Sequence, residues 1–257
     1  MDIFAPHRHQ CGLDIHFERL RESLTRPLIE QRHPALMNAI YLWACFVSRP
    51  EPLCQHEDHY LELALKELPD ALRGAENTID IIQTSCLLSL YFLANGRYME
   101  GGYHASAAAS LAMQSGLGDR ETHLPHIYSY DETGESFELK PPRSDIKAGE
   151  RILTFWQVYN LDRCWSVVLR KPAVVPDNLC TITCPWPQSI SEYETVCTIN
   201  TMRSGKYLIL RRVALMLLPA PQQSAHFCVA KWIPTVSLFK HCVSRHPPSS
   251  PVRAALQ

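Results

Sequence analysis

The sequence predicts an all-α protein, a multi-helix array of antiparallel helical hairpins in a single domain. Apolar residues recur at helical spacing through most of the chain, in runs longer than ordinary β-strands. Pro and Gly fall between these runs, where helices usually end. With 257 residues, 46% of them apolar, the chain can bury a sizeable core.

The first two long helices are predicted from hydrophobic periodicity. Residues 35–46 follow Pro34 and are apolar almost all round, which is typical of a helix buried in a core. Residues 57–68 form an amphipathic pattern. We expect this second helix to stop at Pro69, because proline has no backbone donor for the next turn.

A third helix is expected to begin at Asn77 as its N-cap, with Asp80 at the third helical position. The pair Asn95-Gly96 is expected to end it, because Gly readily adopts the left-handed conformation that follows many helices. A fourth helix then follows directly along the chain.

The fourth helix, 97–114, contains Gly101-Gly102 and a run of small residues. Small side chains allow two helix backbones to approach closely, so this helix is expected to pack on the preceding one as an antiparallel hairpin. Ala107 and Ala108 are expected in that contact.

The second half of the chain contains a further long helix, predicted from about Ala148 to Leu169. A packed irregular loop is expected as far as Pro187, followed by helices at 191–218 and, more weakly, 225–243. The chain thus divides into an N-terminal helical part, a polar loop, a C-terminal helical part and a disordered tail, at 1–125, 126–147, 148–245 and 246–257.

Charge is unevenly distributed along the chain. Residues 195–257 hold eight of the 25 Lys and Arg and none of the 26 Asp and Glu, which leaves 17 basic and 26 acidic residues in 1–194. An acidic body disfavours binding to nucleic acid, which requires clustered cations. No apolar run reaches the roughly 18 residues of a membrane span, so a soluble protein without membrane association is expected.

The ten cysteines contain no Cys-x2-Cys pair, and Cys180 with Cys184 is the nearest approach to one. Zinc modules need such pairs, so reduced thiols, mostly buried, are expected instead. His56 and His59 lack the spacing of zinc proteases, and a solvated first helical turn explains them better. The His-rich N-terminus is expected to be flexible and exposed.

Motifs for nucleotide binding or hydrolysis are absent from the sequence, which indicates that the protein is not an enzyme. Its most distinctive stretch lies in the helix predicted to begin near residue 148. There an aromatic pair, an acid-base pair and a serine precede a basic-proline step and an aspartate: Phe155, Trp156, Asp162, Arg163, Ser166, Lys171, Pro172 and Asp177.

This motif resembles the fungal-specific transcription factor domain, the middle homology region of fungal binuclear zinc-cluster transcription factors, and basidiomycete members are most similar. The family pattern reads Phe-Trp, Asp-Arg, Ser and Gly-Arg-Pro. A second resemblance lies in the fourth helix and its end, at Tyr98, Gly102, Tyr103, Leu111, Ala112, Gly116 and Leu117.

The resemblance implies a nuclear regulatory domain that modulates transcription, senses a small-molecule effector and has a dimer partner or a transcriptional co-regulator. Family members read DNA through a zinc cluster of six cysteines near the N-terminus, and that spacing is missing here. We therefore expect neither a cofactor, nor a metal site, nor sequence-specific DNA binding in this chain alone.

We call the predicted helix that contains this motif, from about Ala148 to Leu169, the signature helix. Its helical spacing places Arg163, Ser166 and Val167 on the buried face begun by Phe155 and Trp156. A buried guanidinium needs paired donors, so Arg163 is expected to meet a carboxylate or several carbonyls from another helix.

Asp162 is one turn from Ser166, whose hydroxyl it is expected to bind. A ligand or switch site at Asp162 and Arg163 is a second interpretation, and a polar contact that fixes helix register is favoured over it.

At one position the sequence departs from the family pattern. Arg170 stands where Gly is usual, and Lys171 where Arg is usual. A residue with a side chain must therefore adopt whatever backbone conformation Gly provides there. The alternative to a transcription regulator is a helical small-molecule binding protein or enzyme, which a pocket of perturbed ionisable groups around Arg163 would favour.

Overall fold

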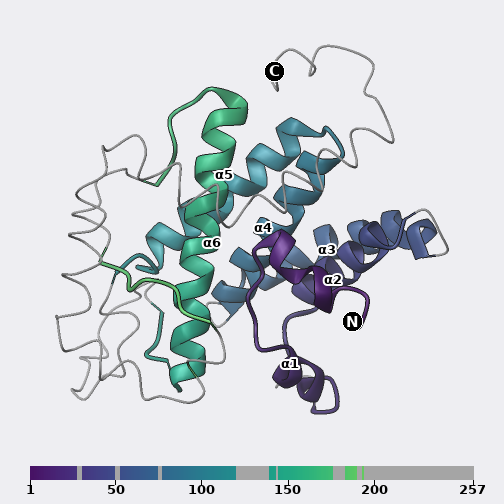
Figure 1. Ribbon diagram of the computed structural model, residues 1–257, viewed down its shortest axis with the longest axis horizontal. Coiled ribbons are helices and arrows are strands. Elements are labelled where there is room, and N and C mark those ends of the chain that lie inside the picture. The colour runs from purple at the N-terminus through teal and green to yellow at the C-terminus, as the bar shows by residue number, and fades with distance from the viewer. Residues whose placement is uncertain are drawn as a thin grey trace.

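The computed structural model describes residues 1–27, 31–49, 53–74, 77–119, 139–142, 144–175, 183–189 and 193. Every regular element in these ranges is a helix, which confirms the all-α prediction. The antiparallel direction of the hairpins stays a prediction. In chain order the helices are η1 (Ala5–Cys11), α1 (Phe17–Ser23), α2 (Pro34–Val47), η3 (Leu53–His56), α3 (Glu57–Ala71), α4 (Thr78–Ala94), α5 (Tyr98–Gln114) and α6 (Asp145–Leu169), shown in Figure 1.

Contacts run from α3 to α2, from α2 to α4, and from α4 to both α5 and α6. Helix α2 begins with Pro34 at its first turn, and the His33 side chain accepts a hydrogen bond from the Ala35 N–H. The helix is apolar on nearly all sides and is therefore buried on nearly all sides. Trp43 fixes it to α4 by donating from Nε1 to the carbonyl of Leu87 over 2.9 Å.

Helix α3 continues past Pro69 to Ala71, so the expected stop at Pro69 was wrong. The proline removes one backbone donor, but the Leu72 N–H still donates to the Leu68 carbonyl at 3.2 Å. A proline this close to the end of a helix therefore leaves the last turn intact.

Helix α4 has the predicted limits, with Asn77 before it and Gly96 (φ 71°) after it. The Asn77 side chain makes no capping hydrogen bond, however. The Arg97 N–H donates back to the Phe92 carbonyl at 2.8 Å, which is the closing bond of a left-handed helix end. The role of Asp80 at the third position is also different from capping, as described below.

Helices α4, α5 and α6 meet at Gly101. The Ser89 hydroxyl of α4 donates to the Gly101 carbonyl at 2.9 Å and accepts from Nε1 of Trp165 in α6 at 2.6 Å. A Cβ on Gly101 would lie 2.6 Å from the Trp165 ring, so only Gly allows the indole to enter between the two helices.

The N-terminal segment packs onto this core, so the expected exposed N-terminus was wrong. Phe4, Cys11, Leu13 and Ile15 are buried. The Gln157 side chain of α6 donates to the Cys11 carbonyl at 3.0 Å. Burial of four apolar side chains in the first 15 residues favours packing of this segment on the core, although polar histidines lie between them.

Helix α6 begins at Asp145, three residues before the expected start. The predicted helices at 191–218 and 225–243 and the tail at 246–257 lie outside the described residues. Across the part of the chain that the structure describes, no helix is long and apolar enough to cross a membrane. The six described cysteines are free thiols, four of them buried.

Ala108 of α5 is fully buried, whereas Ala107 is half-buried. We predict that Ala108→Leu lowers the free energy of unfolding by about 1–3 kcal/mol, because the added methyl groups overpack the contact. Ala107→Leu should cost less. Urea unfolding monitored by circular dichroism measures both, with the exposed Ser110→Leu as a control within about 0.5 kcal/mol of wild type. An unchanged midpoint for Ala108→Leu would contradict close packing here.

Candidate functional site

The aromatic pair that opens the signature motif is buried in α6. Phe155 is fully buried and Trp156 is 3% exposed. The Trp156 ring stacks on Trp186, with ring centroids 4.7 Å apart and an interplanar angle of 12°. Its Nε1 donates to the Pro185 carbonyl at 2.7 Å. Trp156 thus holds residues 183–189 against α6, which confirms the predicted packed loop in its described part.

Asp162 fixes the loop that follows α6. It is buried, and its two carboxylate oxygens accept from the backbone N–H groups of Val174 (3.0 Å) and Val175 (2.8 Å). The expected bond from Ser166 was wrong, because the Ser166 hydroxyl donates within its own helix to the Arg163 carbonyl at 2.8 Å. Two backbone donors satisfy the buried carboxylate at the same place where the chain turns back.

Arg163 is half-buried and donates from Nη2 to the Val175 carbonyl. Its guanidinium carbon lies 4.7 Å from the centroid of the Tyr159 ring, a cation–π contact. This acceptor lies on the loop that follows the same helix, where a partner on another helix was expected. Val167 is 77% exposed, so the predicted buried face does not extend to the end of α6.

Asp162 and Arg163 therefore hold one dipeptide of the returning chain, a contact that fixes local geometry. Lys171 and Pro172 are exposed at the turn, and Asp177 lies outside the described residues. These contacts hold the loop after α6, whereas the favoured interpretation expected the pair to fix the register of a helix. A ligand or switch site at the pair stays the second interpretation.

Arg170 is the one non-glycine residue with a positive φ in the described ranges, at φ 52° and ψ 42°. The Lys171 N–H donates to the Ser166 carbonyl at 3.1 Å, and the Arg170 N–H to the Val167 carbonyl at 3.3 Å. These two bonds form the helix end that usually contains Gly at the left-handed position. The departure from the family's Gly therefore falls where Gly has a physical role.

We predict that Arg170→Gly raises the free energy of unfolding by about 0.5–1 kcal/mol. It removes a left-handed penalty of about 1–2 kcal/mol, part of which the more flexible unfolded chain offsets. Urea unfolding at constant pH and salt measures the change. Arg170→Ala is the matched control, because it removes the charge and keeps the penalty. Equal midpoints for the Gly and Ala variants would refute a role of backbone conformation.

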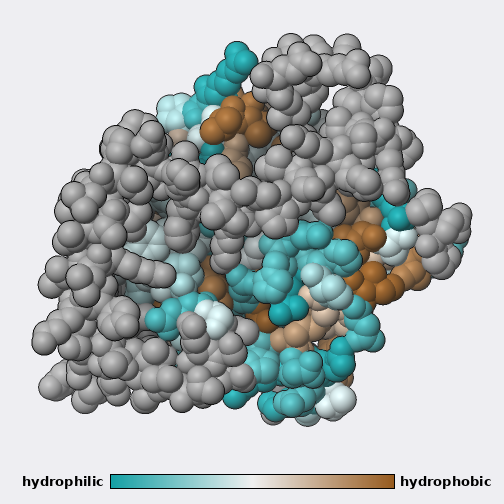
Figure 2. Space-filling view, viewed as in Figure 1, coloured by the Kyte–Doolittle hydropathy of each residue, from teal (hydrophilic) through white to brown (hydrophobic). Residues whose placement is uncertain are grey.

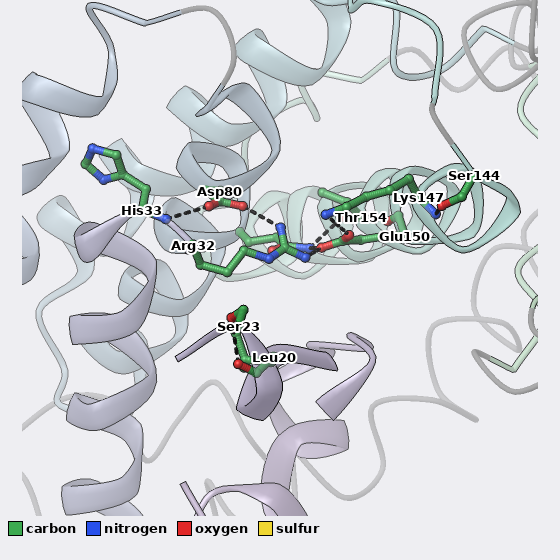
Figure 3. Close-up of polar contacts among 10 residues, drawn as sticks. Leu20, Ser23, Arg32, His33, Asp80, Ser144, Lys147, Glu150 and Thr154 are labelled. Atoms are coloured by element: carbon green, nitrogen blue, oxygen red, sulfur yellow. Dashed lines mark hydrogen bonds and ion pairs between the residues drawn. The ribbon is translucent and has the colours of Figure 1, made fainter. Parts of the chain in front are cut away.

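A buried ionic cluster connects α4 and α6, and the sequence did not predict it (Figure 3). Arg32, before α2, extends between two carboxylates: its Nη1 lies 2.6 Å from Asp80 Oδ1 of α4, and its Nη2 donates to Glu150 of α6. The His33 N–H donates to the other oxygen of Asp80 at 2.8 Å. Lys147 Nζ lies 3.1 Å from the second oxygen of Glu150.

We call Arg32, Asp80, Lys147 and Glu150 the ionic cluster. Asp80 and Glu150 are 8% and 4% exposed, so each needs the cation between them. Asp80 is the only charged residue of α4, a helix that is otherwise mostly apolar. A single charge in such a helix indicates a buried partner of opposite charge, and this signal is present in the sequence.

The ionic cluster controls the protonation of Glu150. Burial alone raises the pKa of this carboxyl, but the charges and hydrogen bonds of Arg32 and Lys147 outweigh burial and bring the pKa down to about 2. Burial also disfavours the charge of Arg32, and the two carboxylates reverse that effect and raise its pKa. Glu150 and Arg32 are therefore both charged at neutral pH.

A second buried carboxylate lies at the start of α3. Glu57 is 5% exposed and accepts from Arg49 Nε (2.7 Å), Arg49 Nη2 (2.5 Å) and the Tyr91 hydroxyl (3.1 Å). The interpretation of residues 56–59 as a solvated turn was therefore wrong for Glu57. In the described ranges, no group of three or more His, Cys, Asp or Glu side chains is placed to hold a metal ion.

We predict that Arg32→Gln lowers the free energy of unfolding by about 3–5 kcal/mol at pH 7, because buried Asp80 loses its cation and buried Glu150 keeps only Lys147. Glu150 has a folded pKa below its unfolded value of 4.5. The contribution of this carboxylate to the free energy of unfolding is therefore complete above about pH 4.5, and it is lost as the pH falls toward about 2.

Urea unfolding of both proteins at pH 7, 5 and 3 tests this prediction. The difference in the free energy of unfolding between wild type and Arg32→Gln should be smaller at pH 3 than at pH 7. Arg19→Gln, which removes an exposed arginine, is the matched control. A difference that is constant across the pH range would show that Arg32 does not act through Glu150.

These contacts describe an all-α domain in which buried ion pairs and one aromatic-rich helix hold the other elements together. The family described as the fungal specific transcription factor domain matches residues 17–245. The match covers most of the chain, so the chain belongs to this family. Neither a curated protein nor a solved structure matches it.

Proposed function

We infer that this chain is the regulatory, middle homology region of a fungal transcription factor and that it modulates transcription in the nucleus. The family match over residues 17–245 is the observation that supports this function. In the described part, the signature residues Trp156, Asp162 and Arg163 all make contacts within the chain. Such contacts suit a domain that acts through its shape and surface rather than through chemistry.

The proposal has two further parts. The domain acts with a dimer partner or a transcriptional co-regulator, and it responds to a small-molecule effector without a cofactor of its own. An effector that binds the folded state raises the melting temperature by an amount that grows with the logarithm of its concentration relative to its Kd. The regulatory function and the effector can therefore be tested separately.

We predict that fusing the full chain to a zinc-cluster DNA reader changes reporter output relative to the reader alone. Ala108→Leu should reduce that change, because it disturbs the packed core on which the surface depends. Ser110→Leu is the matched control, with immunoblotting to compare protein levels. An output identical to that of the reader alone would contradict the proposed function.

The alternative, a helical binding protein or enzyme unrelated to transcription, predicts a different pair of results. A small molecule would then raise the melting temperature of the purified chain, while the fusion would leave reporter output unchanged. A compound that both stabilises the chain and alters output would support the effector part of the proposal.

A further inference from the structure

The end of helix α6 and the loop after it combine exposed apolar and basic side chains. Val167, Val168 and Val174 are 77%, 44% and 47% exposed. Arg170 and Lys171 are exposed between them in the chain. Figure 2 shows hydrophobic atoms beside hydrophilic ones where α6 ends in Figure 1. We call these five residues the α6 tip.

Backbone contacts hold the α6 tip together. The Lys171 N–H donates to the Ser166 carbonyl, so the chain reverses at once after the helix. The Val174 N–H then donates to Asp162, which places Val174 beside the last two turns of α6. The neighbouring Val175 carbonyl accepts from Arg163, which is one helical turn before Val167. Val167 on α6 and Val174 on the returning loop therefore belong to the same end of the helix.

Within residues 163–175, no acidic residue accompanies the charges of the α6 tip. The preceding acid, Asp162, is buried and bound to backbone. Among the described residues, no carboxylate forms an ion pair with Arg170 or Lys171. The surface thus presents cations and apolar groups to a partner.

The conformation of Arg170 is an independent observation. A left-handed non-glycine residue is unfavourable, and such residues gather at functional sites, where strain persists for a reason other than stability. Here the strained residue carries an exposed guanidinium, whose planar fork matches a carboxylate. The strain and the unpaired charge thus occur in the same side chain.

We propose that the α6 tip binds an acidic segment of a partner protein in which carboxylates alternate with apolar side chains. The carboxylates pair with Arg170 and Lys171, and the apolar side chains cover Val167 and Val174. Two cations are too few for nucleic acid, where proteins typically make about 6–10 phosphate contacts. This assignment names the class of co-regulator for the regulatory function proposed above, and it rests on that function.

The test uses the purified full chain and a fluorescein-labelled 16-residue peptide that alternates Asp with Leu and Phe. Binding is measured by fluorescence anisotropy. From the strength of exposed ion pairs, Arg170→Gly should weaken binding about threefold, and Arg170→Gly with Lys171→Ser about tenfold. Val167→Ser should weaken binding about threefold through the lost apolar contact. Added salt should weaken binding to the wild type.

Arg170→Gly is the most informative variant, because it is expected to raise stability while it lowers affinity. Weaker binding by a more stable protein cannot come from unfolding. Arg19→Gln and Leu72→Ser are matched controls that change an exposed arginine and an exposed leucine elsewhere. Both should bind the peptide like wild type.

Several results would overturn the proposal. One is equal affinity of Arg170→Gly and wild type for the acidic peptide. Another is that a peptide with Lys in place of Asp, or with Ser in place of Leu and Phe, binds the wild type as tightly as the acidic peptide does. A third is tighter binding of a random DNA duplex than of the acidic peptide. Self-association that Val167→Ser abolishes would assign the surface to a second copy of the chain instead. The reporter assay can succeed whether or not this peptide binds, so the two failures are distinguishable.

Discussion

The charge on Arg32 is the constraint on which the arrangement of the long helices depends. Asp80 and Glu150 belong to helices α4 and α6, and neither carboxylate can be buried without a cation. Arg32 supplies that cation to both helices from the segment before α2. Helices that are distant in the sequence therefore meet only where this segment is also present. A hydrophobic contact would not impose such a specific register, because apolar surfaces can slide past one another.

From this starting point α6 is fixed along its whole length. Glu150 holds its first turns, and Gln157 binds the N-terminal segment through the Cys11 carbonyl. Trp165 enters between α4 and α5 near its end. Three buried polar groups of α6 bind different parts of the chain: Glu150 binds Arg32, Gln157 binds the Cys11 carbonyl and Asp162 binds the loop after the helix. The signature helix is therefore the element through which the N-terminal segment, the central helices and the following loop are connected.

Local signals explain which parts could be predicted from the sequence. Helices α2, α4 and α5 were predicted within a few residues because Pro34, Gly96 and the apolar periodicity act within one or two turns. The ionic cluster was not predicted, because no local pattern says that Arg32 and Glu150 are neighbours. The same limit applies to the partner of Arg163: the sequence indicated that its donors need acceptors, and only the path of the following loop determines which acceptor is available.

The turn after α6 shows how a left-handed non-glycine residue can persist. Asp162 binds the backbone N–H groups of Val174 and Val175, and the carbonyls of Ser166 and Val167 accept from Lys171 and Arg170. These four hydrogen bonds determine the path of the chain on both sides of Arg170, so its conformation is imposed by its neighbours. The same bonds fix the direction in which its side chain leaves the backbone. Because the backbone on both sides is already fixed, binding here orders only the Arg170 side chain. The entropy cost is smaller than for an arginine on a flexible loop, which favours recognition at this position.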